Sequence, residues 1–401
     1  MIRGILRVLI VTVLAIVFIS GAFTGGYILS QRFFRPAPQP SGGLPADWQP
    51  SLNVFWEAWN YVKQDFYKAP ANETNMMYGA IGGMVQSLGD PHTGFSEPKT
   101  AAINSSNLQG SFEGIGATVE MREGRLTVVS PIKGSPAERA GILPNDIILQ
   151  VDDTVIQNMD VNTAVSLIRG PKGSTVKLLL QRTKVPNFTV SIVRDTIRTP
   201  FVESRMIEGT TLAYLRLNEF GATAPDEMKS ALSELLANKP TGLILDLRRN
   251  PGGYLNVSVD VAGLFLKNGQ AVLIEKTQGG QPQEFKTRGN GIATDIPMVL
   301  LVDGGSASAS EIVAGALKDY GRATLIGTRT FGKGSVQNVH GLSDKSELRV
   351  TIAHFFSPKG NEIHEVGVTP DIEVKITDDD IVNKKDPQLD KAIEVLKSKS
   401  K

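Results

Sequence analysis

The sequence predicts a multidomain α/β protein with an N-terminal membrane helix, a small helical unit, a β-barrel-like module and an α/β core. Three observations support this fold class. The chain has 401 residues, which is too long for one ordinary domain. Residues 8–29 are almost wholly apolar. From Pro200 onward, strand and helix patterns alternate, which is typical of a largely parallel sheet covered by helices.

The composition excludes several classes of function. Lys and Arg total 42 and Asp and Glu total 41, so no overall field attracts nucleic acid, and we expect no nucleic-acid partner. The chain has no cysteine, which excludes cysteine nucleophiles, thiolate metal sites and disulfides. No cluster of histidines or carboxylates suggests a metal or an organic cofactor, and we expect neither.

The N-terminal segment predicts the location of the protein. An apolar run of about 20 residues spans a bilayer as a helix, and residues 8–29 are long enough. Arg3 and Arg7 precede the run, so the positive-inside rule places the rest of the chain outside the cytoplasm. A cleaved signal peptide with its site near Ser20-Gly21-Ala22 is the alternative. Because the run continues past that site, we favour an uncleaved anchor, with the folded part in the periplasm or at the cell exterior.

Composition and periodicity divide the chain into six segments. The expected segments are a membrane anchor or signal segment (1–30), a Pro/Gly/Ser-rich linker (31–50), a helical unit (51–110), a β-rich module (111–198), an α/β core (199–375) and a charged C-terminal tail (376–401). In the helical unit we expect helices near 52–62 and 74–88. The aromatic stripe of the first helix is typical of a core, although it leaves open an interface with a second copy, a homo-oligomer.

The two folded segments differ in their patterns. The module is expected to form a five- or six-stranded, partly open barrel with two helices, its strands at 115–120, 126–129, 146–151 and 175–181 and its helices at 135–140 and 161–168. In the core we expect strands at 212–217, 242–247 and 298–302 and helices at 224–236, 257–266 and from 310 onward. Segments 324–327 and 348–355 are expected to extend the same sheet. The tail, with a short amphipathic stretch at 389–396, is interpreted as solvated.

Ser308 is the first candidate for chemistry. It follows the apolar strand 298–302 directly, and Glu311 three residues later completes a capping-box pattern. Ser308 is therefore expected at a helix N-cap, where free N–H groups and the helix dipole stabilise an oxyanion. Taken alone, the segment fits a purely structural helix cap better.

A serine nucleophile needs a base, and Lys333 is the best candidate. The four histidines stand in no recognisable triad pattern, and no Gly-x-Ser-x-Gly elbow is present. Lys333 lies between two glycines in a stretch poor in charge, and burial lowers the pKa of a lysine. A solvated turn lysine is the alternative. Gln337, four residues on, would share its strand face and orient the amine.

A second glycine-rich turn follows the buried strand 242–247. The sequence Asp246-Leu-Arg-Arg-Asn-Pro-Gly-Gly253 lies where parallel sheets place their ligand sites. The N–H groups of Gly252 and Gly253 are candidates for an oxyanion hole, and a plain strand-to-helix turn is the alternative.

These segments together resemble the carboxyl-terminal processing (tail-specific) proteases, a family of serine peptidases. The motifs that match are Ser-Ala-Ser-Ala-Ser-Glu-Ile at 306–312, Lys-Asp-Tyr-Gly-Arg-Ala at 318–323, Gly-Thr-Arg-Thr-Phe-Gly-Lys-Gly-Ser-Val-Gln at 327–337, Asp-Leu-Arg-x-Asn-x-Gly-Gly at 246–253, Leu-Gly-Asp-Pro-His-Thr at 88–93 and Gly-Val-Thr-Pro-Asp at 367–371. They follow one another in family order and cover about residues 50–375. The resemblance implies a crotonase-like, ClpP-like α/β catalytic core.

The resemblance also implies residue roles. It assigns the nucleophile to Ser308, the general base to Lys333 and the orientation of the lysine to Gln337. The oxyanion hole is assigned to the N–H groups of Ala309, Gly252 and Gly253, and Asp319 and Glu311 are given supporting roles.

Residues 111–198 resemble the PDZ module that this family inserts before its catalytic core. PDZ modules bind a peptide C-terminus as an added strand. Gly114-Ile115-Gly116 is the candidate carboxylate loop, and residues 115–119 the receiving strand. Arg169 is expected to respond to the peptide and couple the module to the active site. The predicted partners are proteins or peptides with free C-termini.

Two other functions remain open at this point. A non-catalytic scaffold would bind C-termini through the PDZ module, but it would be expected to lack an intact Ser–Lys pair. An acyl-CoA enzyme would use a similar core, but it would leave the PDZ module unexplained. The sequence therefore favours a membrane-tethered serine endopeptidase that acts through an acyl-enzyme.

Overall fold

The computed structural model describes residues 49–68 and 70–399. It separates into two compact units, Met1–Ala80 and Ile81–Lys401, which are described in turn. The apolar segment 8–29 lies outside the described residues. None of the helices that are described is both long and apolar enough to cross a membrane.

The first unit contains helix α2 (Gln49–Asp65) and the start of α3 (Glu73–Gln86). The aromatic rings of Phe55, Trp56 and Trp59 contact one another on α2, with centroids 5.2–5.9 Å apart. Trp56 nevertheless keeps 53% of its surface exposed, so the stripe does not form the expected core among the described residues.

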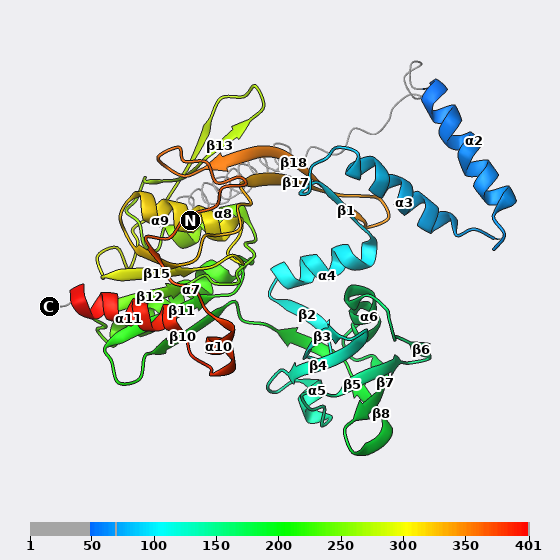
Figure 1. The fold of residues 1–401 in the computed structure, drawn as a ribbon, viewed down its shortest axis with the longest axis horizontal. Coiled ribbons are helices and arrows are strands. Elements are labelled where there is room, and N and C mark those ends of the chain that lie inside the picture. The colour runs from blue at the N-terminus through cyan, green and yellow to red at the C-terminus, as the bar shows by residue number, and fades with distance from the viewer. Residues whose placement is uncertain (1–48, 69, 400–401) are drawn as a thin grey trace, which may run out of the picture. The chain divides into compact units, whose positions relative to one another are not determined.

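A six-stranded sheet forms the centre of the part of the second unit that follows residue 201 (Figure 1). Its order is β10-β11-β12-β15-β16-β19, and only β10 runs antiparallel to its neighbour. The strands are β10 (Val202–Met206), β11 (Leu212–Leu217), β12 (Gly242–Asp246), β15 (Met298–Val302), β16 (Thr324–Gly327) and β19 (Ile372–Glu373). Every residue of β12 and β15 is buried, because both faces of the sheet are covered.

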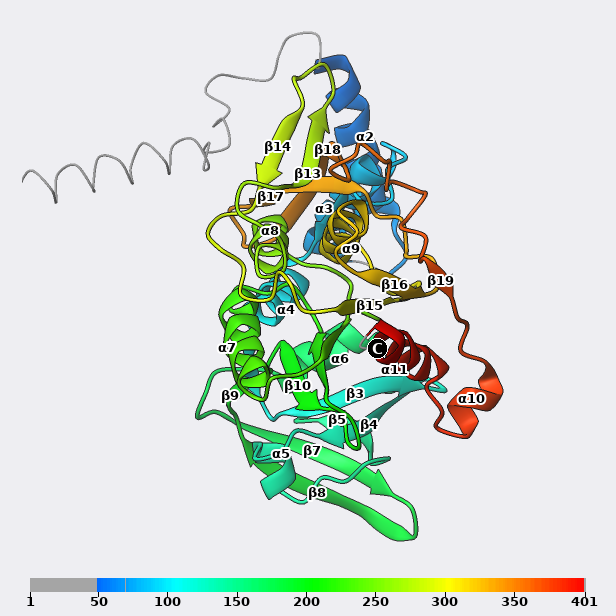
Figure 2. The ribbon, with the colours of Figure 1, turned by 90° about the vertical axis from the view of Figure 1, so that its left-hand side faces the viewer.

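Alternate residues of each strand face two different layers. Ala213, Leu215 and Leu243 pack in the larger core, together with apolar residues of three helices. These helices are α7 (Ala224–Ala237), α8 (Leu255–Ala262) and α9 (Ala309–Asp319). Leu212 and Ile244 face the opposite side, where the C-terminal helix α11 (Pro387–Lys399) covers them. Figure 2 shows α7 and α11 on opposite sides of the sheet.

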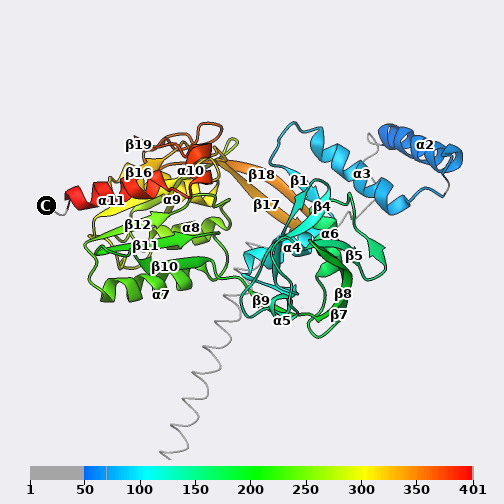
Figure 3. The same cartoon turned by 60° about the horizontal axis from the view of Figure 1, so that its bottom comes forward.

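The position of α11 corrects the expectation of a solvated tail. Ala392 and Leu396 are fully buried against Ile244 and Val299 of the sheet, and Figure 3 shows the helix beside this sheet, where it packs on β15, β16 and β12. A short helix, α10 (Asp378–Val382), precedes it and has no buried residue. The many charged residues of α11 led to the prediction of a solvated tail, but they occupy only the face of the helix that is turned to solvent.

A second sheet of five strands corrects another expectation. Segment 348–355 does not extend the parallel sheet: it forms β18, which pairs antiparallel with β17, β13 and β1. A short turn joins β17 to β18, and such a connection allows only antiparallel pairing. The strands of this sheet are β1 (Gly94–Ser96), β13 (Ala271–Thr277), β14 (Gln283–Lys286), β17 (Ser335–Gly341) and β18 (Glu347–Phe356).

Residues 111–198 form the expected β-rich module with its own core. A six-stranded sheet contains β3 (Ala117–Arg122), β4 (Arg125–Pro131), β5 (Ile147–Val151), β6 (Thr154–Val155), β7 (Thr175–Arg182) and β8 (Val185–Val193). Strands β2 (Ser111–Gly114) and β9 (Asp195–Arg198), which begin and end the module in the sequence, pair with each other. Helices α5 (Pro136–Arg139) and α6 (Val161–Ile168) stand where they were predicted. Helix α4 (Pro98–Leu108) precedes the module.

Candidate active site

The turns after β12 and β15 meet at one edge of the parallel sheet. The two strands are neighbours in register, with Asp246 beside Leu301, so their C-terminal ends lie together. The Ala307 N–H donates to the carbonyl of Asn250 at 3.0 Å, and the Ser310 hydroxyl donates to the same oxygen at 2.9 Å. The Ser306 hydroxyl donates to the Leu247 carbonyl at 2.7 Å, so the serines on either side of Ser308 hold the two turns together.

Ser308 is the N-cap residue of α9, as predicted. Its backbone has φ 54° and ψ −113°, a conformation that non-glycine residues rarely adopt and that costs about 1–3 kcal/mol. The surrounding hydrogen bonds hold this strained turn. Among the described residues the N–H of Ala309, at the start of the helix, has no hydrogen-bond acceptor. That N–H is free to bind an oxyanion beside the serine.

Glu311 joins the turn of Ser308 to the turn of Lys333. Its buried carboxylate accepts the backbone N–H of Ser308 at 2.9 Å, which is the hydrogen bond that the Glu311 side chain contributes to the predicted capping box. It also accepts the N–H groups of Gly332 at 2.6 Å and Lys333 at 2.8 Å, and the hydroxyl of Thr330 at 2.5 Å. One carboxylate thus fixes the distance between two segments that are 25 residues apart.

Lys333 lies in surroundings that favour its neutral form. Burial lowers the pKa of its ammonium group, and the nearby positive charge of Arg349 lowers it further, against smaller opposing effects of Asp90 and Glu311. Among the described residues the ammonium forms no salt bridge. A lysine with a lowered pKa and no ion-pair partner is more readily available as a proton acceptor than a lysine in water.

Gln337 lies close to Lys333 in the chain, but its amide has other partners. The Nε2 group donates to the hydroxyl of Ser335 at 2.8 Å and more weakly to that of Thr351 at 3.4 Å. A register shift between Val336 and Gln337 interrupts the regular alternation of β17, so the simple spacing argument does not place its amide at the amine.

The two glycines of the β12–α8 turn have different roles. The N–H of Gly252 already donates to the side chain of Asn250 at 2.9 Å. An added Cβ at Gly252 would lie 2.8 Å from the Cβ of Ser308, so this glycine allows the turns to approach. In the described chain the N–H of Gly253 has no acceptor. Gly253 and Ala309 are therefore the available pair of donors, and Gly252 supplies space.

A cavity of about 390 Å³ brings the candidate residues together. Its wall includes Ser308, Lys333, Gln337, Gly252 and Gly253. Apolar side chains form much of the rest, among them those of Leu108, Leu255, Ile312, Val336, Val339 and Phe355. Asp319 is not part of this wall: its carboxylate accepts the N–H of Lys359 at 2.8 Å and the amide of Asn361 at 3.1 Å, so it supports a loop.

Among the polar residues of the cavity wall that the sequence reasoning did not assign are Asn107, Glu219 and Arg349. Arg349 comes from β18, and burial raises the pKa of the Glu219 carboxyl. Asp90, in the Gly-Asp-Pro-His turn, accepts the hydroxyl of Thr93 at 2.6 Å and has a pKa of about 2. No local sequence pattern identified Asn107, Glu219 or Arg349. The turn of Asp90, in contrast, belongs to the Leu-Gly-Asp-Pro-His-Thr motif that carries part of the family resemblance.

A second cavity, of about 280 Å³, lies in the 111–198 module. Ile115, Gly116 and residues 117–119 line it, and so does Arg169. Among the described residues the N–H groups of Ile115 and Gly116 have no acceptor. Gly114 lies just outside the cavity wall, at the end of β2. Strand β3, which was predicted to receive a peptide, begins at Ala117 rather than at Ile115.

Arg169 is half-buried in this cavity, and it is incompletely paired. Its guanidinium lies 4.2 Å from the ring centre of Phe112, and it donates to the side chain of Asn107 at 3.0 Å. Its Nε and Nη1 atoms are buried and have no hydrogen-bond partner within residues 49–68 and 70–399. Asn107 lines both cavities, so α4 connects the module to the candidate active site.

Comparisons with known proteins agree with this architecture. Residues 211–374 match the model of peptidase family S41, and residues 127–182 match that of the PDZ domain. The chain is 38% identical over 322 residues to the carboxy-terminal processing protease CtpA of Bacillus subtilis, covering 80% of this chain and 68% of that protein. It is 35% identical over 358 residues to the carboxy-terminal-processing protease of Bartonella bacilliformis, covering 88% and 82%.

A solved structure shares the fold at greater distance. A protein described as an S41 protease from Bacteroides fragilis matches with a TM-score of 0.51 at 17% identity, over 93% of this chain and 96% of that one. The family assignment rests on the length and the percentage identity of the two sequence matches. The chain belongs to the carboxy-terminal processing proteases of peptidase family S41, and it is a serine peptidase with a PDZ domain.

Proposed function

We propose that the enzyme is an endopeptidase that cleaves through a Ser308–Lys333 dyad and an acyl-enzyme. The observation that carries the proposal is one cavity whose wall includes a strained N-cap serine, a half-buried lysine of lowered pKa and a glycine turn with a free N–H. The scaffold alternative would be expected to lack these groups. The acyl-CoA alternative leaves the PDZ domain without a role.

The chemistry follows from these positions. Neutral Lys333 takes the proton of the Ser308 hydroxyl while the oxygen attacks the scissile carbonyl. The N–H groups of Gly253 and Ala309 stabilise the resulting oxyanion. When the C–N bond breaks, the Lys333 ammonium returns the proton to the leaving amine. Lys333 then takes a proton from water, which hydrolyses the ester and restores the hydroxyl of Ser308.

Cleavage of an unstructured protein with an apolar C-terminus tests the dyad. Ser308→Ala and Lys333→Ala should each lower kcat by about 10³-fold or more while the proteins stay folded. Ser233→Ala and Lys229→Ala make the same chemical changes on the exposed face of α7 and should have no effect. Full activity in Ser308→Ala would refute the nucleophile assignment.

We also propose that the PDZ cavity binds the free C-terminus of the substrate. Free N–H groups at Ile115 and Gly116 suit a carboxylate, and the partly unpaired Arg169 supplies a positive charge nearby. A peptide with a free carboxylate should bind at least tenfold more tightly than its amidated form. Arg169→Ala should lower the cleavage of tailed proteins, and unchanged cleavage would contradict the coupling role.

For localisation we propose a single-pass anchor at residues 8–29, with the peptidase outside the cytoplasm. The support is the apolar run and the arginines before it. Reporter enzymes fused after residue 45 should be active only if they function outside the cytoplasm. An N-terminal sequence of the mature protein that starts after residue 22 would establish cleavage instead of anchoring.

A further inference from the structure

The turn that carries Gly253 is strained, and almost all of its backbone donors are occupied. Arg249 has φ 58°, and Gly252 and Gly253 have φ 104° and 142°. The Arg249 N–H donates to Asp303 at 2.8 Å, and the Asn250 N–H donates to the Leu247 carbonyl at 3.3 Å. The hydrogen bonds of these other donors fix the backbone of the turn. The direction of the Gly253 N–H therefore depends on how firmly the turn is held.

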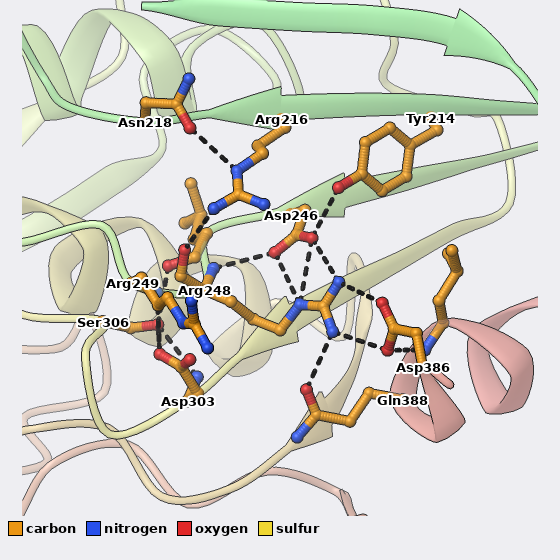
Figure 4. Close-up of polar contacts among 12 residues, drawn as sticks. Tyr214, Arg216, Asn218, Asp246, Arg248, Arg249, Asp303, Ser306, Asp386 and Gln388 are labelled. Atoms are coloured by element: carbon orange, nitrogen blue, oxygen red, sulfur yellow. Dashed lines mark hydrogen bonds and ion pairs between the residues drawn. The ribbon is translucent and has the colours of Figure 1, made fainter. Parts of the chain in front are cut away.

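A buried ionic network holds this turn from the far face of the sheet (Figure 4). Asp246 continues the alternation of Ile244, so its side chain points toward the α11 layer, where it accepts the Tyr214 hydroxyl at 2.7 Å. It also accepts the backbone N–H of Arg248 at 2.9 Å and two guanidinium nitrogens at 2.6–3.0 Å. Arg248, the second residue of the turn, is thereby fixed at both its backbone and its side chain.

The C-terminal segment completes the network. The two carboxylate oxygens of Asp386 accept Nη1 and Nη2 of Arg248 at 2.8 and 2.9 Å, a bidentate pair, and Gln388 accepts Nη1 at 3.1 Å. The Leu389 N–H donates back to Asp386 at 3.0 Å, and the Gln388 amide donates to the Val374 carbonyl at 2.7 Å. The start of α11 is therefore bound directly to the guanidinium of Arg248.

Water has little access to the ion pair between Asp246 and Arg248. Asp246 is fully buried and Arg248 is 8% exposed, and the planar guanidinium fits four carboxylate oxygens at once. Asp386 and Gln388, the acceptors on the C-terminal segment, lie about 140 residues further along the chain than the turn. The C-terminal segment thus supplies a contact that the core cannot form by itself.

We propose that Asp386 is a positioning residue for the oxyanion hole, acting through Arg248 on the turn that presents the Gly253 N–H. The inference rests on the proposed acyl-transfer function of that site. The catalytic geometry then depends on the docked C-terminal segment, although the described residues of this segment contribute no atom to the cavity wall.

Steady-state kinetics of the full-length chain test the proposal. Asp386→Asn should lower kcat about 10–100-fold with KM changed less than about twofold, because only transition-state stabilisation is lost. Its affinity for a peptide boronic acid, which forms a tetrahedral adduct, should fall by a similar factor. Asp386→Glu keeps the carboxylate and should recover part of kcat. Gln388→Met removes one acceptor and should give a smaller fall.

Leu396→Ala is the matched control. It loosens the same helix on its apolar face without touching Arg248, so it should lower the melting temperature but leave kcat unchanged well below the melting point. Unchanged kcat in Asp386→Asn would overturn the proposal, as would an equal fall in Leu396→Ala. Ser308→Ala, assayed in parallel, separates the two ideas, because its retained activity would refute the proposed function itself.

Discussion

At the scale of single residues, the site depends on how charge is arranged around Lys333. Burial and Arg349 both lower the pKa of the lysine, while Asp90 and Glu311 raise it. Arg349 is itself paired with Glu347 at 2.6 Å, which holds its charge in place. The protonation of the general base is therefore set by side chains from several different segments.

Substitution of these charges should move the pH dependence in opposite directions. The rate constant kcat/KM should rise with pH as free Lys333 loses its proton. Arg349→Gln removes a charge that lowers the pKa of Lys333, so the rising limb should move to higher pH. Asp90→Asn removes a charge that raises it, so the limb should move to lower pH. Arg349→Lys keeps the charge and should leave the limb in place; shifts of the same sign in the two charge-removing variants would contradict this account.

Glu311 should be needed for both stability and rate. In Glu311→Gln, either orientation of the amide turns an NH₂ group toward two donors that now lack an acceptor. The free energy of unfolding should fall by about 3 kcal/mol, and kcat should fall because Ser308 and Lys333 lose their common support. Denaturant unfolding and kinetics check both effects. Glu234→Gln, exposed on α7, is the control, and equal behaviour of the two variants would refute the scaffold role.

At the scale of elements, the strands that the sequence identified best are those buried on both faces. Strands β11, β15 and β16 have the predicted bounds, because a continuous apolar run between turns has few other solutions. Strand β18 was predicted in the wrong sheet, because the residue pattern of a strand does not indicate which strand it pairs with. The same limit applies to the site: Ser308 and Glu311 share one helical turn, whereas Arg349 reaches Lys333 only through strand pairing.

The β12–α8 turn should tolerate no side chain at Gly252. An alanine there would adopt a φ near 104° and place its Cβ 2.8 Å from the Ala307 carbonyl oxygen and from Ser308. The turns would separate, so kcat should fall about 10²-fold. Gly304→Ala, on the neighbouring turn, meets no atom within 4 Å and is the control. Kinetics and thermal melting of both variants test this, and an active Gly252→Ala would show that the close approach is dispensable.

At the scale of the whole molecule, the second unit has separate hydrophobic cores. One core contains only residues 115–192, and another contains Phe201 and residues beyond it. The third lies under α11, whose contribution could not be deduced from a segment rich in charge. Because the PDZ domain buries its own apolar residues, we expect its stability to be independent of the peptidase core.

The PDZ domain should therefore be removable without loss of the peptidase fold. Its ends are adjacent, since Ser111 pairs with Arg198 across β2 and β9, so a short Gly-Ser linker can replace residues 112–197. The shortened protein should melt cooperatively and react at Ser308 with a small serine-directed reagent. Its cleavage of tailed proteins should no longer distinguish free from amidated C-termini. Preserved discrimination would place C-terminal recognition in the cavity of Ser308, and an unfolded product would show that the two cores are interdependent.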